Sequence, residues 1–169
     1  MAGGSKIDPT HYGYNNNYSN NIDTIRDEYD RKLFYSFNYY KKPILGICRG
    51  FQLILHEFLS INKYYKQFIK PVFNLNNHHQ INELNIKRSD LFHSIKIDYK
   101  NLYNSTINLK NNMFVNSMHL QGFLISKYFI SNNTFKILAL SNNGTINKKY
   151  NILEAFKIFN FNSPILAVQ

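Results

Sequence analysis

KPILGICRGFQLIL, residues 42–55, is the most informative part of the chain. Its first half, residues 43–47, is a short apolar run that begins at a proline, which is typical of a fully buried strand. In residues 50–58, apolar side chains recur at the spacing of an α-helix. The pattern therefore predicts a buried strand followed directly by a helix, with Cys48 at the junction.

Cys48 is the only cysteine of the chain, and a glycine lies two residues before it and two residues after it. A sharp strand-to-helix turn holds a nucleophile in a strained, exposed conformation and needs small neighbours so that nothing collides. Partial positive charge at the helix N-terminus lowers the pKa of a thiol, and the backbone N–H of Arg49 is placed to stabilise an oxyanion. The alternative is a structural cysteine in the core.

The residues GICRGFQ, 46–52, resemble the nucleophile elbow of class I glutamine amidotransferases, and within them the gamma-glutamyl-gamma-aminobutyrate hydrolase branch. The resemblance implies an α/β fold with a mostly parallel, flavodoxin-like sheet in three layers and a small antiparallel patch between about residues 78 and 125. It also implies that Cys48 is the catalytic nucleophile and that Gln52 binds the glutamyl head group of the substrate.

The chain opens with the glycine-rich stretch GGSKIDPTHYG, residues 3–13, which by composition alone would be a flexible tail. The stretch resembles a loop of the same family that faces the nucleophile elbow. This resemblance implies that a backbone N–H of Gly3 or Gly4 completes the oxyanion hole with that of Arg49. The family usually has an acidic residue where Lys6 stands, so this loop is altered.

The stretch VNSMHLQ, residues 115–121, reads as a strand that ends in polar residues. Taken alone, it indicates a strand end with a hydrogen-bonded histidine. It resembles a family segment that lines the substrate pocket, which implies that Asn116, Ser117 and His119 bind the substrate. Residues 152–156 resemble another family strand, whose Glu154 would lie near the same pocket.

Residues 23–39 are predicted to form a helix that Asp23 caps. Its charged residues are expected to face the solvent or to cap the helix, without a catalytic role, and these are Arg26, Asp27, Glu28, Asp30 and Arg31. Its apolar side is expected to pack inward, and consists of Ile22, Ile25, Tyr29, Leu33 and Phe37.

The adjacent histidines of residues 78–80, HHQ, do not predict a metal site. Neighbouring side chains of an extended segment point to opposite sides, and no cysteine or carboxylate cluster accompanies them in the sequence. We therefore expect neither a metal nor another cofactor.

The 169 residues suffice for one domain, residues 1–169, with a core of its own. The net charge of +10 comes from scattered lysines, so a solvated basic surface is favoured over nucleic-acid binding. A single cysteine excludes an internal disulfide and fits a reducing compartment, which predicts a cytoplasmic protein. No apolar run approaches the roughly 20 residues of a membrane span, so no membrane partner is expected.

The resemblance covers nearly the whole chain, but the family has strands before the diglycine and the His and Glu of a catalytic triad after the final strand, here residues 163–169. We therefore expect an incomplete domain whose function is hydrolysis of a small gamma-glutamyl amide, in a truncated or impaired copy. The alternatives are a catalytically inactive relative that acts as a binding or interaction protein, and a basic nucleic-acid-binding domain. The amine of the substrate, a homodimer and a synthetase partner are left open.

Overall fold

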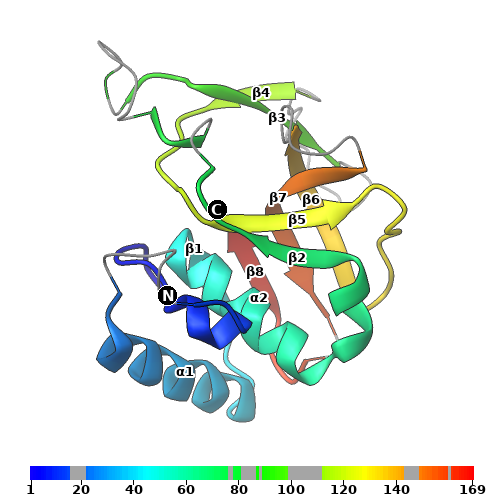
Figure 1. Ribbon diagram of the computed structural model, residues 1–169. Helices are drawn as coiled ribbons and strands as arrows, with labels where there is room; N and C mark the ends of the chain where they lie inside the picture. Colours follow the sequence, from blue (N-terminus) through cyan, green and yellow to red (C-terminus); the bar gives the residue numbers. More distant parts are fainter. Residues whose placement is uncertain are drawn as a thin grey trace.

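The computed structural model describes residues 1–15, 22–75, 78–80, 87, 89–98, 112–142, 149–159 and 161–169. Within them lie two α-helices, α1 (Thr24–Tyr39) and α2 (Arg49–Ile61), and two 3-10 helices, η1 (Pro9–Tyr12) and η3 (Lys63–Gln67). The strands are β1 (Ile44–Ile47), β2 (Ile69–Val72), β3 (His93–Ile97), β4 (Asn112–Val115), β5 (Gly122–Ser126), β6 (Phe135–Asn142), β7 (Tyr150–Ile158) and β8 (Ile165–Val168). In Figure 1 the two helices lie together at one end of the molecule, and β3 and β4 lie at the other.

The described strands form one mixed, mostly antiparallel sheet in the order β1-β8-β7-β6-β3-β4, with β5 on β7 and β2 on β5. Only the pair of β1 and β8 is parallel. The expectation of a mostly parallel, flavodoxin-like sheet is therefore wrong, although the α/β class is confirmed. For β7 and β8 the reason is the length of their connection, because residues 159–164 are fewer than the roughly dozen that a parallel crossover needs.

Strand β7 changes its neighbour along its length. Residues 150–152 pair with β5, whereas residues 155–158 pair with β8. Glu154 lies at the point where one neighbour leaves and the other begins, and its carbonyl accepts the N–H of Gln169 at 2.8 Å. This fork opens the sheet around the Glu154 side chain.

Helix α1 forms where it was predicted, and the Asp23 side chain caps it by accepting the N–H of Arg26 at 3.0 Å. The predicted faces are wrong. Asp27 and Asp30 are buried, whereas Ile25 is 82% exposed and Tyr29 is 65% exposed. The inversion has an electrostatic cause, because α1 turns its carboxylates toward the buried cation of Arg49.

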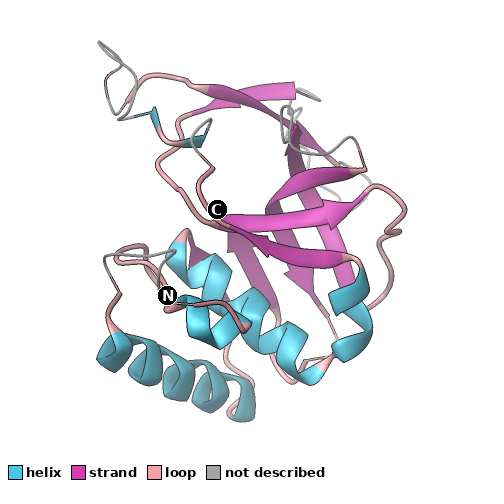
Figure 2. Cartoon of the chain, in the orientation of Figure 1, coloured by secondary structure: helices cyan, strands magenta, loops and turns pink. Residues whose placement is uncertain are grey.

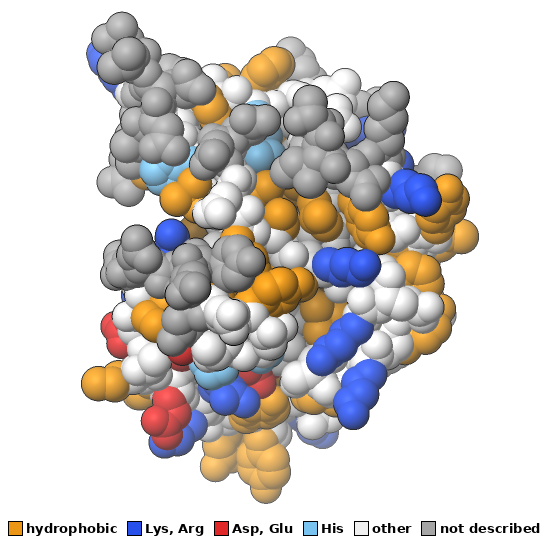
Figure 3. Space-filling view, viewed as in Figure 1, with side chains coloured by type: hydrophobic (Ala, Val, Ile, Leu, Met, Phe, Trp, Pro, Cys, Tyr) orange, Lys and Arg blue, Asp and Glu red, His pale blue; other side chains and the backbone are white. Residues whose placement is uncertain are grey.

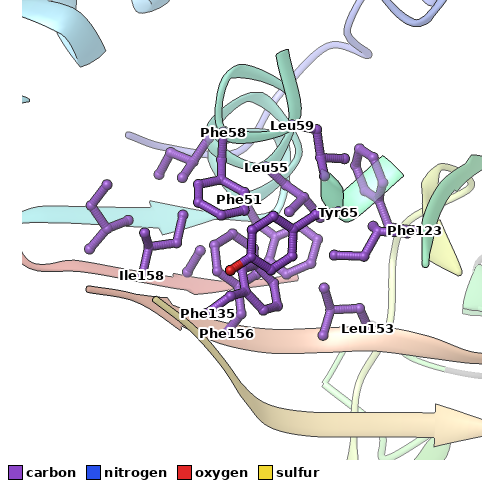
Figure 4. Packing of buried hydrophobic residues seen from close by; sticks show 14 of the residues in the cluster. Phe51, Leu55, Phe58, Leu59, Tyr65, Phe123, Phe135, Leu153, Phe156 and Ile158 are labelled. Carbon is purple, nitrogen blue, oxygen red and sulfur yellow. The ribbon is translucent and has the colours of Figure 1, made fainter. Parts of the chain in front are cut away.

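The main core lies between α2 and the sheet. Phe51, Leu55 and Phe58 on α2 point down onto β6 and β7, where the rings of Phe135 and Phe156 stack with centroids 5.1 Å apart (Figure 4). Burial of each such side chain contributes about 1.5–3 kcal/mol to stability. This packing anchors α2 and thereby fixes the position of its first residue next to Cys48.

Strand β1 is buried on one side only, which corrects the prediction of a fully buried strand. Ile44 is buried, but Leu45 is 48% exposed and Ile47 is 45% exposed. Both described α-helices contact β1, and Figure 2 shows the two helices lying together at one end of the molecule. Residues 43–47 show no alternation of polar and apolar side chains, so their sequence cannot reveal which face is open.

On the face of the molecule drawn in Figure 3, the basic side chains are dispersed. In Figure 3, lysine and arginine side chains form separate spots with uncharged and apolar atoms between them. In the described part of the chain, no helix combines the length and the apolar character that crossing a membrane would require.

Candidate functional site

Cys48 lies at a tight turn between β1 and α2. Its backbone has φ 50° and ψ −105°, a conformation that side-chain-bearing residues rarely adopt, and its N–H donates to the carbonyl of Val168 at 2.8 Å. The flanking glycines are required by packing. A Cβ on Gly46 would lie 2.5 Å from Ile54 Cδ1, and one on Gly50 would lie 2.4 Å from the carbonyl oxygen of Met1. The turn therefore has the geometry of a nucleophile elbow.

The Cys48 thiol is half-buried, and burial raises its pKa above the ordinary value. The backbone N–H of Arg49 donates to the sulfur and lowers the pKa, but this effect is the smaller of the two. The expected net lowering by the helix N-terminus is therefore wrong, because loss of water outweighs the amide dipole. Sγ also accepts a hydrogen bond from Gln169 Nε2 at 3.9 Å.

The diglycine loop lies directly beside the elbow. A Cβ placed on Gly3 would be 3.5 Å from Cys48 Cβ and 3.9 Å from Sγ. Arg26 holds the loop, since its Nη2 donates to the Gly3 carbonyl at 2.9 Å. Gly4 has φ +148°, and a Cβ there would lie 2.2 Å from Arg26 Nη1, so only glycine fits.

The first residue is also anchored. The Met1 ammonium donates to the carbonyl of Leu45 at 2.7 Å, and the Met1 carbonyl accepts the N–H of Ile47 at 3.0 Å. These bonds fix the N-terminal segment along β1. A flexible tail, which composition alone would suggest, is therefore not what the structure shows.

Behind the elbow, the Arg49 guanidinium is 1% exposed and forms ion pairs with Asp27 and Asp30 on α1. We call these three residues the paired cluster. Asp27 also accepts the backbone N–H of Asp8 at 3.1 Å. The paired cluster thus ties the start of α2 to α1 and to the N-terminal loop.

Cys48 lines two cavities. The smaller, of about 160 Å³, lies beside the diglycine loop and is lined by Gly4, Ser5, Lys6, Cys48, Arg49, Gln52, His79, Met118, His119, Leu120 and Gln121. The larger, of about 330 Å³, is lined by Cys48, His93, Ile95, Val115, Asn116, Ser117, Met118, His119, Ala139, Glu154, Ala155, Val168 and Gln169. Gln52 faces the first cavity and Asn116 and Ser117 face the second, so the expected substrate-binding residues do not share one pocket. Only His119 among them lines both.

Three of the expected substrate-binding residues, Gln52, Ser117 and His119, make side-chain hydrogen bonds within the protein. Gln52 Nε2 donates to the carbonyl of Gln121 at 2.9 Å. Ser117 donates its backbone N–H to Gln80 Oε1 at 2.6 Å and its hydroxyl to the carbonyl of His78. Ser117 therefore holds residues 78–80 in place.

Gln121 is a polar residue to which the sequence reasoning gave no role. Its side chain is buried, and neither its amide nitrogen nor its amide oxygen has a hydrogen-bond partner among the described residues. An unpartnered buried amide is costly, so this group is suited to meet a polar ligand in the smaller cavity. Its place in the VNSMHLQ stretch was the available signal.

His78, His93, His119 and Glu154 form a second buried group, which we call the histidine cluster. The Glu154 carboxylate lies 3.4 Å from His78 Nδ1, 3.9 Å from His93 Nε2 and 3.8 Å from His119 Nε2. Local sequence does not reveal this cluster, because the residues next to His78 in the chain predict only that His78 and His79 point to opposite sides. The side chains do alternate as expected, but residues 78–80 run antiparallel to residues 117–119, which brings His78 and His119 together.

Burial dominates the protonation of the histidine cluster. It lowers the pKa of His78 to about 4 and that of His119 to about 3, and it lowers the pKa of His93 as well. Burial also raises the pKa of Glu154 to about 7. At neutral pH the three imidazoles are therefore uncharged, with one ring nitrogen each able to accept a bond.

A sequence model of the Peptidase C26 family matches residues 1–169. This family is class I glutamine amidotransferase-like and includes gamma-glutamyl hydrolase. No curated protein matches the chain.

Proposed function

Because the chain belongs to the Peptidase C26 family, we propose that it cleaves gamma-glutamyl amides by acyl transfer to Cys48. The supporting observation is the position of the sulfur, which lies on a strained turn at a helix N-terminus with the diglycine loop against it. Such a site presents a nucleophile and backbone donors to one carbonyl group. Gamma-glutamyl-gamma-aminobutyrate is one candidate substrate of this class.

In the proposed reaction the Cys48 thiolate attacks the gamma-carbonyl carbon, and the carbonyl oxygen becomes an oxyanion. The intermediate then breaks its C–N bond as the amine takes up a proton. Water attacks the resulting thioester, which releases glutamate and restores the thiol. Backbone N–H groups around the oxyanion stabilise charge that develops only in the transition state.

We assign the two oxyanion donors to the N–H groups of Arg49 and Gly4. The Arg49 N–H already points at the sulfur. In a trans peptide the C=O and the following N–H point in opposite directions, and the described part of the chain has no cis bond. Since Arg26 holds the Gly3 carbonyl, the Gly4 N–H points away from Arg26, and Gly4 shares a cavity with Cys48.

The smaller cavity is the proposed site of the glutamyl group. Gln52 and Gln121 offer amide groups there, and those of Gln121 have no partner among the described residues. A glutamyl head group carries a carboxylate and an ammonium, which need an amide donor and an amide acceptor respectively. His119 lines both cavities and would contact the amide portion that is cleaved.

Acylation also requires a base, because the raised pKa keeps the Cys48 side chain a thiol at neutral pH. Within the residues the structure describes, no imidazole or carboxylate hydrogen-bonds to Sγ, and the side chain beside it is the Gln169 amide. We therefore propose that residues 1–169 by themselves turn over slowly. The same observation favours a second candidate function, in which the protein binds a gamma-glutamyl amide without cleaving it.

Hydrolysis of gamma-glutamyl amides by wild type, Cys48→Ala and Cys48→Ser, with binding measured by calorimetry, separates the two functions. Slow glutamate release that both substitutions abolish supports the hydrolase. Binding of equal affinity in wild type and Cys48→Ala, without glutamate release, supports the binding protein. Glutamate release that persists unchanged in Cys48→Ala contradicts the proposed mechanism.

A further inference from the structure

We propose that the histidine cluster of His78, His93, His119 and Glu154 binds a zinc ion. The four side chains come from separate parts of the chain: residues 78–80, β3, residues 116–121 and β7. One candidate ligand atom from each lies within 4.8 Å of all the others. The site does not depend on the proposed hydrolysis, although it shares His119 with the proposed substrate site and its wall faces the same cavity as Cys48.

The spacing of the ligand atoms is close to that of a tetrahedral zinc site. Zinc–nitrogen bonds of about 2.0–2.1 Å place neighbouring ligand atoms about 3.3 Å apart. Glu154 Oε1 lies 3.4 Å from His78 Nδ1 and 3.9 Å from His93 Nε2, and Oε2 lies 3.8 Å from His119 Nε2. The four ligand atoms are up to 4.8 Å apart, which is wider than the tetrahedral spacing. Small movements of side chains would close the remaining gap around an ion.

Two of the rings are oriented as zinc ligands are. His119 Nδ1 lies 3.0 Å from the carbonyl oxygen of Gln121, and His93 Nδ1 lies 3.4 Å from that of Ser94. A carbonyl accepts only from a protonated ring nitrogen, which leaves Nε2 with its lone pair. In both rings this Nε2 faces Glu154, and a backbone partner on the far nitrogen is the usual support of a metal-bound imidazole.

His78 supplies an independent observation. Its Nδ1 is fully buried, has no hydrogen-bond partner among the described residues, and lies 3.4 Å from Glu154 Oε1. A buried nitrogen without a partner is costly unless another group meets it. An ion at the centre of the cluster would satisfy His78 Nδ1, and the Glu154 carboxylate is already oriented by the Ser141 hydroxyl, which donates to Oε1 at 2.5 Å.

The larger cavity, which His93, His119 and Glu154 of the histidine cluster line, has no lysine or arginine side chain among its described lining residues, although the chain is strongly basic. Imidazole with carboxylate is a ligand set that suits zinc among the divalent ions. Four protein ligands complete a tetrahedron, which is typical of structural rather than catalytic zinc. The ion would cross-link the walls of the Cys48 cavity and hold His119 in place.

The test uses residues 1–169 stripped with EDTA and titrated with zinc chloride against a chromophoric chelator. We expect one zinc ion per chain and a rise in Tm of at least about 5 °C at saturating zinc. His93→Gln and Glu154→Gln should raise the Kd for zinc by at least about 100-fold. His79→Gln, which alters the adjacent histidine outside the cluster, is the matched control and should bind like wild type.

Cobalt chloride provides a second test, which uses only the wild-type chain and therefore does not depend on whether a variant folds. Cobalt(II) in wild type should show the visible absorption of a four-coordinate site, and zinc should displace it. Far-UV circular dichroism reports whether each variant is folded. The proposal is overturned if wild type retains no zinc against the chelator, if cobalt gives only a six-coordinate spectrum, or if folded His93→Gln and His79→Gln bind zinc equally well.

Discussion

The paired cluster and the histidine cluster are two buried polar groups near Cys48. They differ in how the cost of burying their polar atoms is offset. In the paired cluster, the Arg49 cation meets the carboxylates of Asp27 and Asp30. In the histidine cluster, the Glu154 carboxylate faces three imidazoles that burial keeps uncharged at neutral pH. In the first group the charges are compensated because Arg26 Nε also lies 3.6 Å from Asp30, whereas the second group leaves ring nitrogens available to a ligand.

This difference in charge compensation suggests different roles for the two clusters, one in the fold and one in ligand binding. The paired cluster locks α1, α2 and the N-terminal loop around the elbow, so its removal should damage the fold. The histidine cluster forms one wall of a cavity that Cys48 also lines, so its removal should chiefly change what the cavity binds. Substitutions in the two groups should therefore differ first in stability.

The largest effect on stability is expected for Arg49→Met. The substitution removes the Arg49 cation from buried Asp27 and Asp30 and leaves only the longer Arg26–Asp30 pair of 3.6 Å, which should lower the free energy of unfolding by about 3–5 kcal/mol. Urea denaturation followed by circular dichroism measures the change. Lys32→Met is the control, because the Lys32–Glu28 pair is exposed and solvent screens it, so its loss should change stability far less. Similar values for the two variants would show that the paired cluster is not what holds the elbow.

The second-largest loss of stability is expected for Gly4→Ala, in the diglycine loop that Arg26 holds. Gly13→Ala is the matched control, since Gly13 also has positive φ but no atom within 4 Å of an added Cβ. The control should cost about 1–2 kcal/mol from backbone strain. Gly4→Ala should cost about 1–3 kcal/mol more, because φ +148° lies outside the left-handed region that alanine can adopt and because the Arg26 side chain must move away from the Gly3 carbonyl that it holds. Equal thermal stability of the two variants would contradict the described packing.

A smaller effect is expected for His93→Gln in metal-free protein. The His93 ring makes one long hydrogen bond, of 3.4 Å, and lies 3.9 Å from the nearest carboxylate oxygen. Loss of these contacts should change the free energy of unfolding by about 1 kcal/mol or less. Urea denaturation in EDTA checks the value. A loss as large as that of Arg49→Met would show that the two clusters do not differ as described.

The last expected effect is on the reactivity of the Cys48 thiol, which should depend on pH, and not on the stability of the fold. Burial raises its pKa from the ordinary value of 9.0, so the thiolate forms only as pH rises through a higher value. The rate of alkylation by iodoacetamide should therefore reach half its maximum at a higher pH in the folded chain than in urea. A lower midpoint in the folded chain would mean that the helix N-terminus outweighs burial.

Local sequence patterns were sufficient for the elbow and for the element boundaries. The proline-initiated apolar run and the helical spacing after it predicted β1 and α2 around Cys48, and Asp23 marked the start of α1. The strand predicted in residues 163–169 is also present, as β8. Each of these features depends on residues that are near one another in the sequence.

The features that depend on distant partners could not be predicted in this way. Asp27 and Asp30 are buried because Arg49, which lies 22 and 19 residues further on, is buried with them. The apolar pattern of α1 alone therefore indicated the wrong face. The histidine cluster likewise needs four segments to meet, and its carboxylate lies at a fork of β7 that no local pattern indicates.

The most direct measurement compares how fast a glutamine-like diazoketone and iodoacetamide modify Cys48 in folded and in urea-unfolded protein, followed by mass spectrometry. If Cys48 is an acyl-accepting nucleophile beside a glutamyl site, the diazoketone should label Cys48 faster in the folded chain, and a gamma-glutamyl amide should protect it. Iodoacetamide should show the opposite order, because burial raises the thiol pKa. Slower labelling of the folded chain by both reagents, without protection, would contradict the assignment of Cys48.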